Sequence, residues 1–370
     1  MPDPRSLPPR VNLVVLFGGQ SAEHDVSRAT AAHVMAALDP DRYAVRAIGI
    51  TRDGRWVRAD DAAVGALAAL RQHELGVGPA IAIGVDVEGP TTAPTAALAV
   101  ADSSAPTVVL PLLHGPLGED GTVQGLLELA GVAYVGAGVL ASAVGMDKAM
   151  AKTVLDAHHI PQAGWMSIIE HELTPGTAAA VVQRFGLPVF VKPANMGSSV
   201  GVTKAKTVAQ VRTAIDNALT YDRVVVVEEA ILGREIEVAV LGNESPRASL
   251  PGEVLPGHEF YDFEDKYLDD GAKLIIPAML DDDAIGAVQA MALQVFTALR
   301  CEGLARIDFF YEEGGRGLLC NEANTMPGFT PISMYPKLWQ ASGLSYRDLL
   351  DELVRLALER HARRRRNTNR

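Results

Sequence analysis

The sequence has little of what marks secreted or membrane proteins. It contains two cysteines, Cys301 and Cys320, in 370 residues. That is too few for a disulfide framework, and both lie in apolar segments, so we interpret them as reduced structural thiols. No apolar run is long enough to cross a bilayer. The first ten residues contain four prolines and no apolar segment followed by a cleavage site, so we predict no signal peptide. These absences favour the cytoplasm.

Positive charge is also scarce. The chain has 33 Lys and Arg against 45 Asp and Glu, and its net charge of −12 argues against nucleic-acid binding. The basic run at 361–370 is interpreted as a solvated terminus. With 48% hydrophobic residues the chain can bury a sizeable core, and its length predicts about two to three domains.

Two common nucleotide-binding fingerprints are missing from the segment where a phosphate site is otherwise expected. The short buried strand 188–193 ends in Lys192 and Pro193 and leads into a Gly/Ser loop, 194–202, that is neither a Walker A motif nor a dinucleotide fingerprint. Its backbone N–H groups could still surround phosphates. Another buried strand, 224–227, follows and ends in acidic residues. These elements indicate a nucleotide site of a different kind.

Polar residues interrupt two apolar strands near the C-terminal end. Arg306 and Asp308 are two residues apart, as are Glu322 and Asn324, and residues 311–317 between them are rich in turn formers. Side chains at i and i+2 share a face of a strand. If the strands pair, Asp308, Glu322 and Asn324 converge as hard oxygen ligands, a set that suits Mg²⁺ beside substrate phosphates. A surface hairpin with solvated charges is the alternative.

The order of these parts resembles the ATP-grasp fold, and further motifs resemble the D-alanine–D-alanine ligase family. The motifs are His114–Gly125, 306–328, Phe17–Ser27, Met146–Lys148 and Tyr261–Tyr267. The resemblance runs from about Val11 to about Asp351. Cys320 departs from it, because a branched aliphatic residue is usual there, and we expect Cys320 to face the core.

The resemblance implies an α/β protein with an ATP-grasp fold. We expect an N-terminal doubly wound parallel-sheet domain over residues 1–136. A central α+β lid domain would span 137–231, and a C-terminal α+β domain with the metal site would span 232–370. The residues agree, since they predict strands at 11–17, 43–50 and 107–113 and helices at 27–38 and 346–360. The segment 60–105 carries little pattern, and no chemistry is expected there.

The resemblance also implies ATP as cosubstrate with two Mg²⁺ or Mn²⁺ ions on Asp308, Glu322 and Asn324. Lys148 and Lys192 would bind the α- and β-phosphates. Backbone groups at Glu228 and Ile231 would bind adenine, Glu235 the ribose, and Phe310 would form the floor of the adenine pocket. The nucleotide-binding set is completed by Ser198, Ser199 and Lys266.

For the amino-acid substrates the resemblance implies a second set of residues. Glu23 would anchor the ammonium group of the first substrate, with Ser198 and Tyr267 hydrogen-bonded to it across two loops. His114, at the end of a predicted strand, would orient the first carboxyl group. Arg306 and the Gly328 N–H would stabilise the tetrahedral oxyanion. Ser333, Arg306 and a backbone N–H near Met334 would hold the second carboxylate. Glu119 and Asp120 would orient neighbours without touching substrate.

The function expected is ATP-dependent ligation of two D-alanines through an acylphosphate, for peptidoglycan precursors, by a homodimer that binds neither nucleic acid nor membrane. Tyr267 favours D-alanine as second substrate, because phenylalanine at that position accompanies D-lactate in the family. A D-alanine–D-lactate ligase, another ATP-grasp carboxylate–amine ligase and a non-enzymatic nucleotide-binding protein are the alternatives. Another ATP-grasp ligase would not need the His114–Gly125 motif. A non-enzymatic nucleotide-binding protein would not need Glu23, Arg306 and Ser333 together.

Overall fold

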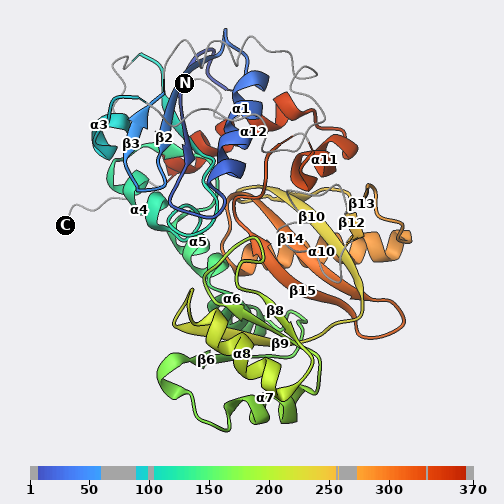
Figure 1. Ribbon diagram of the computed structural model, residues 1–370. Coiled ribbons are helices and arrows are strands. Elements are labelled where there is room, and N and C mark those ends of the chain that lie inside the picture. The colour runs from blue at the N-terminus through green and yellow to red at the C-terminus, as the bar shows by residue number, and fades with distance from the viewer. Residues whose placement is uncertain are drawn as a thin grey trace, which may run out of the picture.

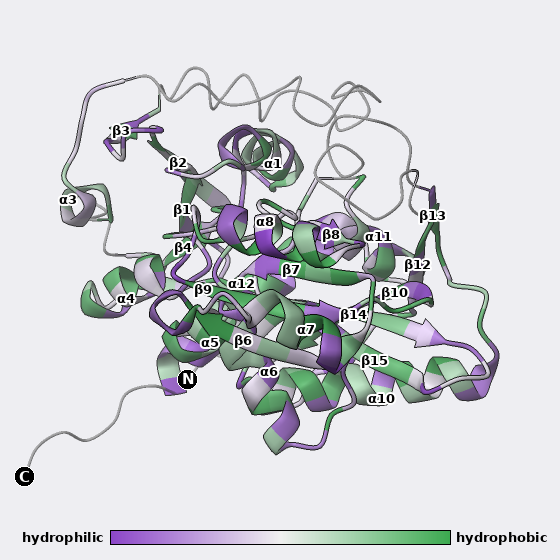
Figure 2. Cartoon of the chain, turned by 60° about the horizontal axis from the view of Figure 1, so that its bottom comes forward, coloured by the Kyte–Doolittle hydropathy of each residue, from purple (hydrophilic) through white to green (hydrophobic). Residues whose placement is uncertain are grey.

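The computed structural model describes residues 7–59, 89–98, 104–255, 257, 273–330 and 332–363, which form three β-sheets surrounded by helices (Figure 1). Helices α7 and α10 are banded with hydrophobic and hydrophilic residues, as expected of elements that bury one side and expose the other (Figure 2). No helix among these residues is long and apolar enough to cross a membrane.

The N-terminal sheet has the strand order β3-β2-β1-β4-β5, and its strands pair in parallel except for the edge strand β3. Its elements are β1 (Val11–Gly18), α1 (His24–Ala37), β2 (Tyr43–Ile50), β3 (Trp56–Arg58), α3 (Pro94–Leu98), β4 (Thr107–Pro111), α4 (Thr122–Leu129) and β5 (Ala133–Tyr134). Leu13 and Val15 of β1 share a core with α1, whereas Val14 and Leu16 share one with α3 and α4. Both faces of the sheet are therefore covered, as the prediction of a doubly wound fold requires.

The turn after β1 demands glycine. Gly18 has a φ of 87°, and a Cβ there would lie 2.3 Å from the carbonyl oxygen of Ile50. The Ser27 hydroxyl accepts the Gly18 N–H at 2.8 Å and donates to the Leu112 carbonyl. Ser27, a residue of α1, thus links the ends of β1 and β4. The helix begins at His24, three residues before its predicted start.

The central sheet is antiparallel with the order β6-β9-β7-β8, and its core lies against two helices. Its elements are β6 (Trp165–Ile169), the short helix Glu170–Glu172, α7 (Thr177–Phe185), β7 (Val189–Pro193), β8 (Thr203–Ala205), α8 (Val208–Ala218) and β9 (Val224–Glu229). Two helices precede it, α5 (Val139–Met146) and α6 (Lys148–Ala157). Their buried residues share a core with the C-terminal sheet.

The C-terminal sheet has the order β13-β12-β10-β14-β15, with β11 paired to β10. Its elements are β10 (Arg234–Gly242), β11 (Arg247–Ala248), β12 (Gly252–Leu255), β13 (Lys273–Ile275), α10 (Asp282–Ala298), β14 (Gly303–Glu312), β15 (Gly317–Asn324), α11 (Met334–Ala341) and α12 (Tyr346–Arg363). Ile236, Val238 and Val240 share a core with α10. The alternate residues Glu235 and Glu237 therefore face the other way.

The last helix returns to the first sheet (Figure 1). Asp351 of α12 accepts hydrogen bonds from Tyr43, at 2.5 Å, and from Arg42. The buried guanidinium of Arg360 donates to the carbonyls of Tyr134 and Gly136. These contacts hold α12 against the N-terminal sheet. The domain boundaries at 136/137 and 231/232 remain a prediction.

Both cysteines are free and buried, and burial raises the pKa of each thiol to about 12. The prediction that Cys320 faces the core is confirmed. Such thiols remain protonated and unreactive near neutral pH.

Candidate active site

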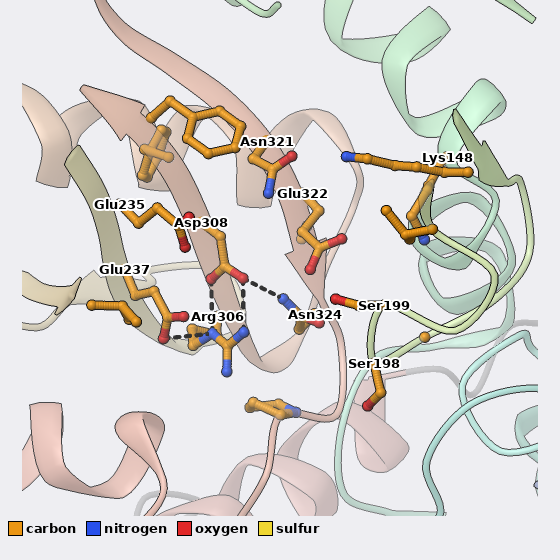
Figure 3. A pocket seen from close by; sticks show the side chains of 18 of the residues that line it. Lys148, Ser198, Ser199, Glu235, Glu237, Arg306, Asp308, Asn321, Glu322 and Asn324 are labelled. Carbon is orange, nitrogen blue, oxygen red and sulfur yellow. Dashed lines mark hydrogen bonds and ion pairs between the residues drawn. The ribbon is translucent and has the colours of Figure 1, made fainter. Parts of the chain in front are cut away.

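A cavity of about 1220 Å³ is lined by residues from all three sheet regions. One side is formed by Glu235, Glu237, Asp308 and Glu322, which we call the acidic wall; opposite it lie Lys148, Ser198 and Ser199 (Figure 3). Lys148, Lys152 and Lys192 form what we call the basic wall. A cavity with carboxylates on one side and ammonium groups on the other can hold a polyphosphate together with cations.

The acidic wall is set by strand register. Glu237 of β10 lies opposite Asp308 of β14, and Asp308 lies opposite Glu322 of β15. The next pair on the same face of these strands is Arg306 opposite Asn324. The predicted hairpin is confirmed, although its turn is shorter than expected, because Tyr311 and Glu312 belong to β14.

A β-bulge in β15 lets one strand serve both the core and the cavity. Phe309 pairs with Cys320 while Asp308 pairs with Glu322, so Asn321 is the extra residue. Without the bulge, Cys320 and Glu322 would share a face, since they are two residues apart. With it, Cys320 is buried in the core and Glu322 lines the cavity.

Arg306 lies between two carboxylates of the acidic wall (Figure 3). Its Nε and Nη2 donate to the two oxygens of Asp308, each at 2.7 Å, and Nε is also 3.0 Å from Oε2 of Glu237. The Asn324 amide donates to Asp308 at 2.9 Å. Asp308 is thus shared between the guanidinium and any cation that binds there.

The donors of this site fit a hard divalent cation. In the part of the chain that the structure describes, no three His, Cys, Asp or Glu side chains cluster as a metal site. The predicted set instead combines Asp308 and Glu322 with the amide of Asn324, whose nitrogen faces Asp308 and whose oxygen is therefore the atom left to bind a cation. Two carboxylates with few other protein ligands match the way Mg²⁺ binds beside phosphates.

The basic wall contains a buried ion cluster. Glu228, at the end of β9, is 2.8 Å from the Nζ of Lys192 through Oε2 and 3.1 Å from the Nζ of Lys152 through Oε1. Burial raises the pKa of Glu228, but the two ammonium groups outweigh it and hold the pKa at about 2. Burial lowers the pKa of Lys192, and the Glu228 charge more than reverses this. Glu228 and Lys192 are therefore both charged at neutral pH.

Lys148 contacts the Gly/Ser loop. At the start of α6, its Nζ donates to the Met196 carbonyl at 2.6 Å. In the same loop Ser198 and Ser199 have positive φ values of 47° and 58°, a conformation uncommon for residues other than glycine. Both serines line the cavity, as predicted.

Glu23 and Ser198 meet across 175 residues of sequence, since the Ser198 hydroxyl donates to a Glu23 carboxylate oxygen. Two glycines make room for this carboxylate. A Cβ at Gly197 would lie 2.9 Å from Glu23 Oε2, and one at Gly115 would lie 3.0 Å from it. Glu23 is buried at 6% exposure and lines the cavity, so a negative charge is held where an ammonium group can reach it.

His114 and Glu119 connect the loop after β4 with the loop after β15. The His114 Nδ1 lies 3.1 Å from the Met326 carbonyl, and its buried Nε2 has no hydrogen-bond partner among the described residues. Burial lowers the pKa of His114. In the neutral ring Nδ1 is the donor, which leaves Nε2 as an acceptor.

Glu119 accepts hydrogen bonds from two backbone N–H groups, Gly115 at 2.7 Å and Met326 at 3.3 Å. Burial and the nearby Glu23 charge raise its pKa to about 8. These contacts agree with the expectation that Glu119 orients its neighbours. Asp120 likewise accepts from the backbone of Leu117 and Thr122.

The structure places the other predicted residues as follows. Gly328 and Ser333 are adjacent, because a Cβ at Gly328 would lie 3.0 Å from the Ser333 Oγ. Ser333 precedes α11, whose N-terminus favours a carboxylate. Ile231, Glu235 and Phe310 line the cavity. Tyr267 and Lys266 lie outside the described residues.

Lys152 and Glu237 are among the charged residues that line the cavity and that the sequence prediction missed. Lys152 is four residues after Lys148 on a helix, and Glu237 is two residues after Glu235 on a strand. In each case the spacing puts the missed residue on the same face as a predicted one. This signal could have identified both.

Comparisons with known proteins give a consistent picture. Residues 12–137 match the family model described as D-ala D-ala ligase N-terminus, and residues 154–355 match the model for its C-terminus. A D-alanine--D-alanine ligase from Kineococcus radiotolerans is 47% identical over 372 residues, covering 95% of this chain and 98% of the relative. D-alanine--D-alanine ligase A from Chromobacterium violaceum is 45% identical over 363 residues, covering 95% and 96%.

Among solved structures, the D-alanine-D-alanine ligase from Coxiella burnetii superposes with a TM-score of 0.79 at 36% identity, covering 96% of each chain. The VanG D-Ala:D-Ser ligase from Enterococcus faecalis gives a TM-score of 0.74 at 30% identity, covering 94% of this chain and 99% of the other.

Proposed function

Because the chain belongs to the D-alanine–D-alanine ligase family, we propose that it joins two D-alanines into D-alanyl-D-alanine with conversion of ATP to ADP and phosphate. The product serves peptidoglycan precursor synthesis. The observation that carries the proposal is the position of Glu23. A buried carboxylate, held by Ser198, lies in the same cavity as the acidic wall and the basic wall, so an amino acid and a nucleotide can bind side by side.

Activation of the first D-alanine requires its carboxylate to attack the γ-phosphate of ATP. Glu23 binds the ammonium group of that substrate and so directs the carboxylate toward the phosphates. His114 completes the subsite. In the neutral ring its Nε2 accepts a hydrogen bond from the substrate ammonium group. A hydrogen bond to the substrate carboxylate would require the protonated ring, in which Nε2 is a donor. Lys148 and Lys192 neutralise phosphate charge.

Divalent cations belong to the same proposal. Asp308, Glu322 and Asn324 would hold Mg²⁺ or Mn²⁺, which would neutralise the β- and γ-phosphates. For the nucleotide, backbone groups at Glu228 and Ile231 bind the adenine, Glu235 the ribose hydroxyls, and Phe310 packs on the ring. Ser199 and Lys266 complete this set.

The second D-alanine then attacks the acylphosphate with its amine, phosphate leaves, and the amide forms. Arg306 and the backbone N–H of Gly328 stabilise the oxyanion of the tetrahedral intermediate. The Ser333 hydroxyl, Arg306 and the N-terminus of α11 hold the carboxylate of this substrate. The family resemblance implies that Tyr267 hydrogen-bonds with Ser198 and Glu23, and loops joined in this way would exclude water, which would hydrolyse the acylphosphate.

A direct assay tests the proposal. Purified protein with ATP, Mg²⁺ and D-alanine should release one phosphate per D-alanyl-D-alanine formed, with the dipeptide identified by mass spectrometry. L-alanine in place of D-alanine should yield neither product above background. Phosphate release without dipeptide, or equal turnover of L-alanine, would contradict it. The relatives favour D-alanine over D-lactate as second substrate, and adding D-lactate to the assay tests this.

A cytoplasmic homodimer is also proposed, on the family resemblance. Light scattering on the purified protein tests the dimer. The measured molar mass should be twice the chain mass of 39.3 kDa.

A further inference from the structure

Lys152 is a fully buried lysine to which the mechanism above gives no role. Its exposure is 2%, and it is among the largest buried side chains of the described residues. Lysine is almost never fully buried unless its charge is paired, because removing an ammonium group from water is costly. Its position on the cavity side of α6, one turn after Lys148, therefore needs a reason.

The charge balance of the cluster shows that Lys152 is not needed to neutralise Glu228 alone. Lys192 already pairs with Glu228 Oε2 at 2.8 Å, and Lys152 adds a second ammonium group at 3.1 Å from Oε1. Two lysines and one glutamate carry a net charge of +1. Among these three side chains one positive charge is in excess, and beyond Glu228 the carboxylates of Glu322 and Glu235 also act on Lys192, from across the cavity.

The two lysines also differ in depth. The Lys192 side chain is 12% exposed and Lys152 is 2% exposed, so Lys192 is the more accessible from the cavity. Each binds a different oxygen of Glu228. If the Lys192 ammonium turns from Oε2 toward a phosphate, the contact between Oε1 and Lys152 remains.

We propose that Lys152 is a positioning residue for the nucleotide site: it holds the Glu228 carboxylate in place while Lys192 turns from Glu228 to a phosphate of ATP. The inference rests on the proposed function at one point, namely that the anion bound by Lys192 is a phosphate of the nucleotide. Without Lys152, the buried Glu228 carboxylate would retain Lys192 as its one remaining counter-ion. The phosphate would then compete with Glu228 for that ammonium group, and nucleotide binding would weaken.

Isothermal titration with ADP and Mg²⁺, in the absence of D-alanine, tests this. Lys152→Met keeps the length of the side chain and removes its charge, and it should weaken ADP binding by about tenfold, as expected for an unpaired buried charge. Lys206→Met, the same change at an exposed lysine, is the matched control and should bind as the wild type does. A Kd for folded Lys152→Met within twofold of wild type would overturn the proposal.

A double variant separates positioning from a general structural role. If Lys152 acts through the Glu228 charge, Glu228→Gln should cancel the effect of Lys152→Met, so that the double variant binds ADP within about twofold of Glu228→Gln alone. A tenfold loss that persists in the Glu228→Gln background would overturn the proposal. This comparison holds even if Lys152→Met alone fails to fold, because replacing both partners of a buried pair is tolerated better than removing one.

Steady-state kinetics supply a second readout. Lys152→Met should raise the KM for ATP and leave the KM for D-alanine within twofold, and an equal rise in both would argue for distortion of the whole cavity. Failure of the wild type to form dipeptide would overturn the proposed function. It would leave the ADP titrations, and hence this inference, intact.

Discussion

The two walls of the cavity are built differently. All carboxylates of the acidic wall project from neighbouring strands of one sheet, where the pairing of β10, β14 and β15 fixes their order. The lysines of the basic wall come from helix α6 and from strand β7 of the central sheet. Glu228 of β9 holds Lys152 and Lys192, and the Met196 carbonyl holds Lys148. Backbone register places the acidic wall, whereas tertiary contacts place the basic wall.

This difference predicts different responses to substitution. A carboxylate on a paired strand keeps its position when its charge is removed, so the chemistry should be lost and the fold retained. A lysine held by a buried partner shares its charge with that partner, so its removal should change the partner as well.

Removing the charge of Glu322 should have the largest effect. Glu322→Gln should lower kcat at least about 100-fold, the scale of a lost charge-stabilising group. The melting temperature should stay near that of wild type, because the backbone pairing with Asp308 is unchanged. Glu313→Gln, the same change at an exposed residue of the same hairpin, should keep full activity. Near-normal turnover of Glu322→Gln would remove Glu322 from the metal site.

Glu23→Gln should separate the amino-acid subsite from the nucleotide site. The KM for D-alanine should rise about 10- to 100-fold, the range for a lost hydrogen bond to a charged group. ADP affinity should not change, because Glu23 belongs to neither wall. Asp25→Asn, two residues away, is the control, because Asp25 is partly exposed and pairs with Arg28 and Arg52 outside the cavity. A loss of ADP affinity would place Glu23 in the nucleotide site.

Tyr267→Phe should shift the choice of second substrate. The variant retains the ring and loses one hydroxyl, and the hydrogen bond that the family resemblance implies for this hydroxyl would be worth about 0.5–1.5 kcal/mol. With D-alanine and D-lactate supplied together at neutral pH, the variant should form D-alanyl-D-lactate and keep part of its dipeptide activity. A product ratio equal to that of wild type would show that Tyr267 does not select the second substrate.

Acid should weaken the ion cluster of the basic wall. The Glu228 pKa is about 2 in the folded protein against an ordinary value of 4.5, so the unfolded chain binds the proton more readily. The stability that Glu228 contributes is complete above about pH 4.5 and is lost as pH falls toward 2. The difference in melting temperature between wild type and Glu228→Gln should therefore shrink from pH 7 to pH 3.5. A constant difference would mean that the Glu228 charge contributes nothing to folding.

The sequence could predict what local periodicity determines. Arg306 and Asp308 lie on one face of a strand, as do Glu322 and Asn324, and this follows from the two-residue period of a strand. The strand 43–50 was predicted with its observed bounds. Glu23, Ser198 and Ser333 entered through the family resemblance, since residues so distant in sequence show no pattern of their own.

What depends on long-range packing could not be predicted. The bulge at Asn321 places Cys320 and Glu322 on opposite faces of the sheet, and no residue in the segment indicates a bulge. The ion pair between Lys152 and Glu228 joins helix α6 to strand β9, 76 residues later in the chain. No local pattern indicates that these two residues pair. The helix α1 was predicted to begin at Ser27, but it begins at His24. The Ser27 hydroxyl does not cap the helix and instead bonds to the backbone of Gly18 and Leu112.

The most direct test of the two-wall account is a crystal structure with ADP and Mn²⁺, in which anomalous scattering locates the metal. We predict Mn²⁺ between the phosphates and the oxygens of Asp308, Glu322 and Asn324, with Lys148 and Lys192 on the phosphates from the opposite side. Mn²⁺ bound away from these three residues, or phosphates that contact neither lysine, would contradict the account.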